Sequence, residues 1–222
     1  MEDAITLAVC LKDAGPAAVE LAKRMLGPIA DELGLLGSDA IRTFRFKRAI
    51  AAIEKAAIGL HNAGIDPKSV RPGLLFPILE GASFEDDETL HDCWAGLLAN
   101  AANPDFEDGV LPSFPEILKQ LTPFEAKLLS KIYDDILEHH TRRDLNDQQT
   151  NMEMMKYGLA GIEYPVFDTM LKETPEVVVD NMERLGVFKR YPMSEDFGNT
   201  VAIFGMSAFG RRFVEACRGT QE

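Results

Sequence analysis

Residues 83–104, SFEDDETLHDCWAGLLANAANP, carry the clearest helix signals in the chain. Ser83 has Asp86 three residues after it, and the acidic run 85–88 would lie at the positive end of a helix dipole. Asn103-Pro104 supplies an end. The stretch predicts an amphipathic helix that begins after Ser83, with a buried stripe of Leu90, Trp94, Leu97, Leu98 and Ala101.

A second helix is predicted upstream, over residues 39–63. Its apolar residues recur at steps of three and four, and Gly64 is well placed to end it. The predicted stripe is Phe46, Ile50, Ile53, Ala57 and Leu60. Arg45, Arg48 and Lys55 fall on the other side, either as a solvated face or as partners of nearby acids.

The remaining segments also favour helices until the last part of the chain. A short apolar helix is predicted to start or kink at Pro77, and a helix should begin at Thr122-Pro123. The polar residues 138–152 predict an exposed turn or a boundary. Further helices are predicted near 165–172 and over 176–185, the latter ended by Gly186.

Two short strands, 187–191 and 200–204, flank a polar turn and predict a β-hairpin. Ser207 should cap a final helix. Helix, helix, hairpin, helix is the order of a winged-helix module. The predicted fold is therefore mostly α, a helical bundle with a C-terminal winged-helix-like module. The expected divisions are a Gly-Pro-hinged helical segment over 1–37, a central helical domain over 38–150 and the module over 151–222.

Composition narrows the class of protein. Of the 222 residues, 46% are hydrophobic and 27% charged, which excludes a disordered chain or a fibre. No apolar run has the length of a membrane span, and no secretory leader is apparent. Cys10, Cys93 and Cys217 are far apart in sequence, so each is expected to be a small hydrophobe in a reducing, cytoplasmic setting.

Asp87 stands out within the acidic run. On a helical wheel it falls near Trp94 and Leu98, where an ionised carboxylate needs a partner. We therefore hypothesise that Asp87 or a neighbour docks on the long helix through Arg45 or Arg48. The alternative is that Asp87 caps its own helix or lies in water.

A metal site is a weaker interpretation of the same region. Glu88 and His91 have the Glu-x-x-His spacing of carboxylate-bridged metal bundles, with Asp92 beside them, but the second copy that such sites need is missing. The sequence also has no nucleophile elbow, zinc-protease helix, phosphate loop or dinucleotide loop. The expectation is a protein that is not an enzyme and has no cofactor.

Nucleic-acid binding is the other alternative. The net charge of −13 opposes it, and the helix 176–185 that would enter the groove is mainly acidic. Only a local set of cations favours it: Lys189, Arg190, Arg211 and Arg212.

Several stretches, in order, resemble the Abi-alpha family of bacterial abortive-infection-like proteins. They are LGPIADELGLLGSDAIRTFRFKRAIAAIEKA at 26–56, PILEGASFEDDETLHDCWAGLLANAA at 77–102, PSFPEILKQLTPFEAKLL at 112–129, DNMERLGVF at 180–188 and GMSAFGRRFVEAC at 205–217. Cys93 and residues 138–157 depart from the family pattern.

The resemblance implies a bacterial or phage-borne protein associated with defence against phage. The leading hypothesis is a non-enzymatic defence protein with a switchable helical interface at Arg45, Arg48, Lys55, Asp87 and Trp94, and with a protein partner or self-association. A nucleic-acid-binding regulator and a metal-dependent hydrolase or nuclease using residues 85–92 remain alternatives. Membrane contact would involve only the amphipathic residues 5–37.

Overall fold

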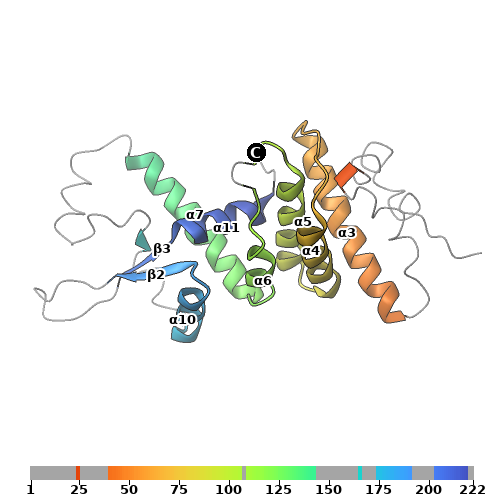
Figure 1. Cartoon of the computed structure of the whole chain (residues 1–222). Helices are drawn as coiled ribbons and strands as arrows, with labels where there is room; N and C mark the ends of the chain where they lie inside the picture. The colour runs from red at the N-terminus through yellow and green to blue at the C-terminus, as the bar shows by residue number, and fades with distance from the viewer. Residues whose placement is uncertain are drawn as a thin grey trace, which may run out of the picture. The chain divides into compact units, whose positions relative to one another are not determined.

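The computed structural model describes residues 24–25, 40–106, 109–143, 165–166, 174–191 and 203–219 (Figure 1). The chain divides into two compact units. Unit 1 contains Met1–Pro123 and Glu215–Glu222, and unit 2 contains Phe124–Val214. The boundaries expected near residues 37 and 150 lie outside the described residues, as does the segment 5–37 apart from Arg24 and Met25.

Unit 1 is built on α3 (Ala40–Asn62), α4 (Pro72–Phe84), α5 (Glu88–Ala102) and the short α6 (Phe114–Leu118). Helix α3 packs on both α4 and α5, those two pack on each other, and α6 contacts both of them. The predicted stripe of α5 is buried, as is that of α3 apart from Phe46, which is half-buried. Burial of these apolar faces is the main force that holds the helices together.

Helix α3 has the predicted extent and the predicted end. Gly64 adopts a φ of +68°, and the Ile65 amide donates to the Leu60 carbonyl at 3.0 Å. A residue with a side chain is strained at this φ, which explains the glycine.

Helix α4 begins at Pro72, not at Pro77, and runs through Pro77. Pro72 fills the first turn, where no amide partner is required, and the buried leucines on both sides of Pro77 keep the segment helical.

The predicted start of α5 at Ser83 is wrong. Ser83 lies in the last turn of α4, and its hydroxyl donates to the Glu80 carbonyl at 2.7 Å. Asp87 is the N-cap instead, with its Oδ1 accepting from the Thr89 amide at 2.9 Å and the Leu90 amide at 3.1 Å. The sequence has two cap candidates four residues apart, and the buried residues that precede Ser83 extend α4 past the first one.

Unit 2 contains most of α7 (Pro123–Arg143) together with α10 (Glu176–Arg184). Helix α7 starts as predicted but continues through residues 138–143, where a turn was expected; residues 144–152 lie outside the described part. No glycine or proline interrupts residues 124–143, and polarity alone does not end a helix. The Asn181 amide of α10 donates to the Glu125 carboxylate at 2.8 Å.

A small antiparallel sheet completes unit 2, with the order β1-β3-β2. Strand β2 (Phe188–Tyr191) pairs with β3 (Ile203–Met206), so the predicted hairpin strands are present, the second shifted from 200–204. The expected turn between them falls outside the described residues.

The helix expected near residues 165–172 is wrong at its start. Pro165–Val166 forms β1, which pairs with β3 at the edge of the sheet, and residues 167–172 are outside the described part. An edge strand accommodates proline because one side of its backbone needs no partner.

The last helix, α11 (Ala208–Arg218), starts as predicted after Ser207. The Ser207 hydroxyl accepts from the Gly210 amide at 2.8 Å and donates to the Gly186 carbonyl at 2.6 Å. A side chain at Gly210 would come within 2.2 Å of the Val187 carbonyl oxygen, so the contact between α11 and residue 187 requires a glycine. The mostly helical fold class is thus confirmed. Among the described residues, no helix combines the length and the apolar character needed to cross a membrane.

Candidate functional site

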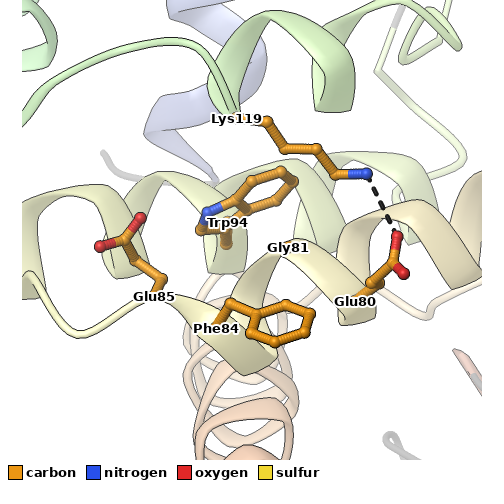
Figure 2. A pocket seen from close by; sticks show the side chains of 6 residues that line it. All are labelled: Glu80, Gly81, Phe84, Glu85, Trp94 and Lys119. Atoms are coloured by element: carbon orange, nitrogen blue, oxygen red, sulfur yellow. Dashed lines mark hydrogen bonds and ion pairs between the residues drawn. The ribbon is translucent and has the colours of Figure 1, made fainter.

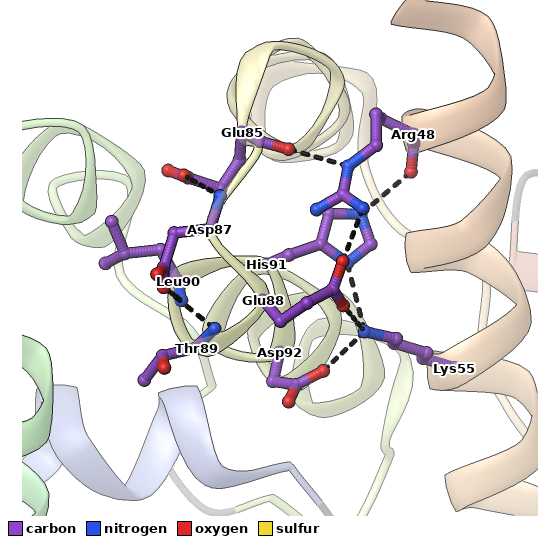
Figure 3. Close-up of polar contacts among 9 residues, drawn as sticks. All are labelled: Arg48, Lys55, Glu85, Asp87, Glu88, Thr89, Leu90, His91 and Asp92. Atoms are coloured by element: carbon purple, nitrogen blue, oxygen red, sulfur yellow. Dashed lines mark hydrogen bonds and ion pairs between the residues drawn. The ribbon is translucent and has the colours of Figure 1, made fainter. Parts of the chain in front are cut away.

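A cluster of charged residues joins α3 to the start of α5 (Figure 3). The Arg48 guanidinium donates from Nε to the Glu85 carbonyl oxygen at 2.6 Å and from Nη1 to the Glu88 carboxylate at 2.7 Å. The Lys55 ammonium, two turns further along α3, donates to Glu88 at 2.9 Å and to Asp92 at 2.6 Å. We call Arg48, Lys55, Glu85, Glu88, His91 and Asp92 the α3–α5 cluster.

His91 is the buried centre of this cluster. Its Nε2 lies 3.0 Å from the Arg48 carbonyl oxygen, and its Nδ1 lies 3.3 Å from the Lys55 ammonium nitrogen. A carbonyl only accepts and an ammonium only donates, so Nε2 carries the hydrogen and the ring is neutral. Burial, with the charges of Arg48 and Lys55, lowers the pKa of His91 despite its hydrogen bond to the Arg48 carbonyl.

Glu88 and Lys55 are both charged at neutral pH. Hydrogen bonds from Arg48 and then Lys55 lower the pKa of Glu88 to about 2. Burial lowers the pKa of Lys55, but the hydrogen bonds to Asp92 and Glu88 outweigh it, so the pKa of Lys55 lies above its usual value. The cluster therefore holds opposite charges on two helices around one neutral imidazole.

Asp87 has a different role from the docking contact hypothesised for its own side chain. It caps α5, whereas its neighbours Glu85, Glu88 and Asp92 contact α3. Asp87 therefore caps its own helix, which was the alternative hypothesis. The neighbouring residue Glu88 makes the predicted contact with an arginine of the long helix.

Arg45 and Trp94 lie close to the end of α4. The Arg45 Nε donates to the Ser83 hydroxyl at 3.3 Å, and its guanidinium carbon lies 3.7 Å from the centre of the Phe84 ring. Trp94 is buried, and a Cβ at Gly81 would lie 2.3 Å from its indole ring. The indole thus packs directly on the backbone of α4.

A pocket of about 310 Å³ opens beside this packing contact (Figure 2). Its lining residues are Glu80, Gly81, Phe84, Glu85, Trp94 and Lys119. The Lys119 ammonium lies 3.2 Å from the Glu80 carboxylate at one side, and Glu85 lies at the other (Figure 2). Phe84 is 61% exposed, so the part of its ring that Arg45 does not cover is available to a partner.

The three weak metal candidates do come together. One ligand atom from each of Glu88, His91 and Asp92 lies within 4.8 Å of the others. The Lys55 ammonium, however, contacts all three, and it supplies the positive charge that two carboxylates require (Figure 3). A metal ion would have to displace Lys55, so this arrangement fits an internal ion pair better than a metal site.

The nucleic-acid candidates belong to unit 2. Lys189 and Arg190 are exposed on β2, and the Arg190 guanidinium lies 3.1 Å from both Asp180 and Glu183 of α10. Asp180 and Glu183 therefore neutralise the charge of Arg190. They lie on α10, the helix that would enter a groove if the module bound nucleic acid. Arg211 and Arg212, both half-buried on α11, make further contacts.

The contact between α5 and residues 215–219 was not predicted from the sequence. The Asn100 amide donates to the carbonyl oxygens of Glu215 at 3.2 Å and Ala216 at 3.0 Å. A Cβ at Gly96 would lie 1.9 Å from the Cys217 carbonyl oxygen, so this helix face touches backbone directly. One signal in the sequence pointed to this contact. Gly96 lies inside a strong helix, and a glycine there lowers helix stability, so its presence suggests that another segment packs closely on the helix.

Residues 39–217 match the family described as abortive infection alpha. The chain belongs to this family. No curated protein and no solved structure matches it.

The abortive infection alpha match begins one residue before α3 and ends at Cys217. It therefore includes the α3–α5 cluster, the pocket beside Trp94 and the contact of α5 with residues 215–217. The family expected from the sequence is confirmed, and its description suggests abortive-infection-like defence.

Proposed function

We propose that this abortive infection alpha protein is a non-enzymatic phage-defence protein that acts through protein interactions, with the contact between α3 and α5 as its switch. Membership of the family is the observation that carries the defence role. The cluster and the pocket support the interaction mechanism.

The α3–α5 cluster has the properties of a contact that can open. Glu88 and Asp92 are exposed, and exposed ion pairs contribute only about 0–1 kcal/mol each. A partner with its own cations could take these carboxylates from Arg48 and Lys55. The helices also share an apolar interface, so opening would require both a competing charge and a surface to cover the apolar residues.

The pocket beside Trp94 is the surface that we assign to the partner. The exposed ring of Phe84 suits an apolar side chain, and Glu85 with the exposed Asp86 next to it suits a basic neighbour. The proposed occupant is thus a protein segment with an apolar residue beside a lysine or arginine. The net charge of −13 favours the approach of such a segment.

For unit 2 we propose a winged-helix-like module that contacts protein. The sheet order β1-β3-β2, with α10 before the hairpin strands and α11 after them, supports this assignment. The pairing of Arg190 with the acids of α10 favours protein contact over nucleic acid. Because Cys93 and Cys217 are unpaired thiols, we propose the cytoplasm as the location.

Phage plating on a host that expresses the chain tests the proposal. We expect fewer plaques and growth arrest of infected cells with the wild type. Phe84→Ala should abolish protection, whereas Phe76→Ala should retain it, because Phe76 is a similarly exposed phenylalanine on α4 that does not line the pocket. Plating that is unchanged by the wild type across a broad phage panel would contradict a self-sufficient defence protein. Equal protection by both variants would contradict the role of the pocket.

A further inference from the structure

Cys93 and Cys217 are distant in sequence but meet in unit 1. Cys93 lies in α5 and Cys217 in the last turn of α11, and each thiol is close enough to the other to influence its pKa. The close approach of Gly96 to the Cys217 carbonyl oxygen, one turn of α5 after Cys93, places the two backbones side by side independently of the thiols. Asn100 fixes the same segment from the next turn.

The two thiols differ in environment. Cys93 is half-buried, whereas Cys217 is buried. The hydrogen bond from Cys217 lowers the pKa of Cys93, although burial and the nearby carboxylates Asp92, Asp87 and Glu85 oppose this. Burial raises the pKa of Cys217 well above its usual value. Cys93 is therefore the accessible sulfur with more thiolate character, and Cys217 is the protonated partner next to it.

We propose that Cys93 and Cys217 are a dithiol modification site that hydrogen peroxide converts reversibly into a disulfide, which fastens residues 215–219 to α5. Both sulfurs are free thiols in the structure, which is the reduced state.

The chemistry balances with one peroxide molecule per pair. The Cys93 thiolate attacks one peroxide oxygen, the O–O bond breaks, and the departing hydroxide takes a proton to become water. The Cys93 sulfenic acid then reacts with the Cys217 thiol: the S–S bond forms, the S–O bond breaks, and the hydroxyl leaves with the thiol proton as a second water. The two sulfurs together lose two electrons, and the peroxide gains them. A thiol reductant reverses the change.

The disulfide would act at a particular place in the chain. Residues 1–123 build unit 1, residues 124–214 build unit 2, and the chain returns to unit 1 at Glu215. The reduced protein holds this return through hydrogen bonds from Asn100 and the packing at Gly96. Oxidation would replace a separable contact with a covalent one.

The test uses the full chain with Cys10→Ser, so that only the pair remains. Purified protein is treated with hydrogen peroxide and analysed by intact mass and by non-reducing peptide mapping. We expect a mass lower by two hydrogen atoms, a peptide that links Cys93 to Cys217, and full reversal by dithiothreitol. The oxidised protein should also melt at a higher temperature than the reduced protein, because a cross-link restricts the unfolded chain.

Two further variants assign the roles of the sulfurs. Cys217→Ser should stop the reaction at a Cys93 sulfenic acid that dimedone labels, and Cys93→Ser should leave the Cys217 thiol unreacted over the same period. The proposal is overturned by stable thiols under conditions that oxidise free glutathione, by sulfinic acid at Cys93 without the linked peptide, or by links between chains only.

Discussion

Gly96→Ala should release residues 215–219 from α5. The added Cβ would lie 1.9 Å from the Cys217 carbonyl oxygen and 2.8 Å from the Gly219 amide nitrogen, whereas ordinary contact begins at 3.4 Å. Both neighbours are backbone atoms, which cannot move aside by a change of rotamer. The segment must therefore shift away from the helix.

The magnitude follows from three contributions. Overpacking of a close contact costs about 1–3 kcal/mol. Displacement of the segment also breaks the two hydrogen bonds of the buried Asn100 amide, for which about 1–3 kcal/mol is the expected loss. Alanine recovers about 1 kcal/mol of helix propensity. The free energy of unfolding should fall by about 1–5 kcal/mol.

Urea unfolding followed by tryptophan fluorescence measures this loss. The chain has one tryptophan, Trp94, which lies in unit 1, so its emission reports on the affected unit. Gly73→Ala is the matched control, because Gly73 is also helical and a Cβ there meets nothing within 4 Å. The control should be equal to or more stable than the wild type by up to about 1 kcal/mol. If Gly96→Ala were as stable as Gly73→Ala, the backbone contact would not hold the segment.

Four further predictions concern the α3–α5 cluster and the cap of α5. Asp87→Ala should lower the free energy of unfolding by about 1 kcal/mol through loss of the cap, while Asp86→Ala should change it by less than about 0.5 kcal/mol; thermal melts decide. Because the pKa of His91 is lowered from 6.5, the unfolded chain binds more protons below that pH, so stability should fall as pH drops from 6.5 towards the lowered pKa. His91→Gln should remove this part of the pH profile; a profile identical to that of the wild type would contradict a neutral His91. Glu88, with a pKa lowered from 4.5 to about 2, stabilises the fold above pH 4.5, and Glu88→Gln should flatten the profile only below that value. Lys55→Met removes the ammonium among the candidate ligands, so Zn²⁺ should raise the melting temperature of this variant and not that of the wild type, whereas equal shifts would show that Lys55 does not exclude the ion.

Periodicity and end signals predicted the long helices well. For α3 the apolar stripe and Gly64 gave both its face and its end, and for α11 Ser207 gave its start. The predicted start of α5 was wrong because Ser83 and Asp87 are both good N-cap residues. Only the packing of α4 decides between them, and that depends on residues far away in sequence.

The part of the candidate site that depends on opposite charges could be predicted from the sequence. Opposite charges on α3 and on residues 85–92 suggested a cross-helix contact, and Arg48, Lys55, Glu88 and Asp92 make it. The helical wheel gave a wrong position for the Asp87 side chain. Asp87 precedes the first helical residue of α5, so its direction does not follow the helical rotation. The pairing of Cys93 with Cys217 could not be predicted, since it depends on where the chain returns to unit 1.

The return of the chain also sets an order of assembly during synthesis. The carbonyl of Ala216 is made 116 residues after the Asn100 amide to which it bonds. At about 5–20 residues per second, α5 waits roughly 6–23 seconds for this partner. All of unit 2 is translated in that interval, since residues 124–214 come between. A ribosome that stalls within unit 2 therefore leaves the Gly96 face of α5 without the backbone that covers it in the folded chain.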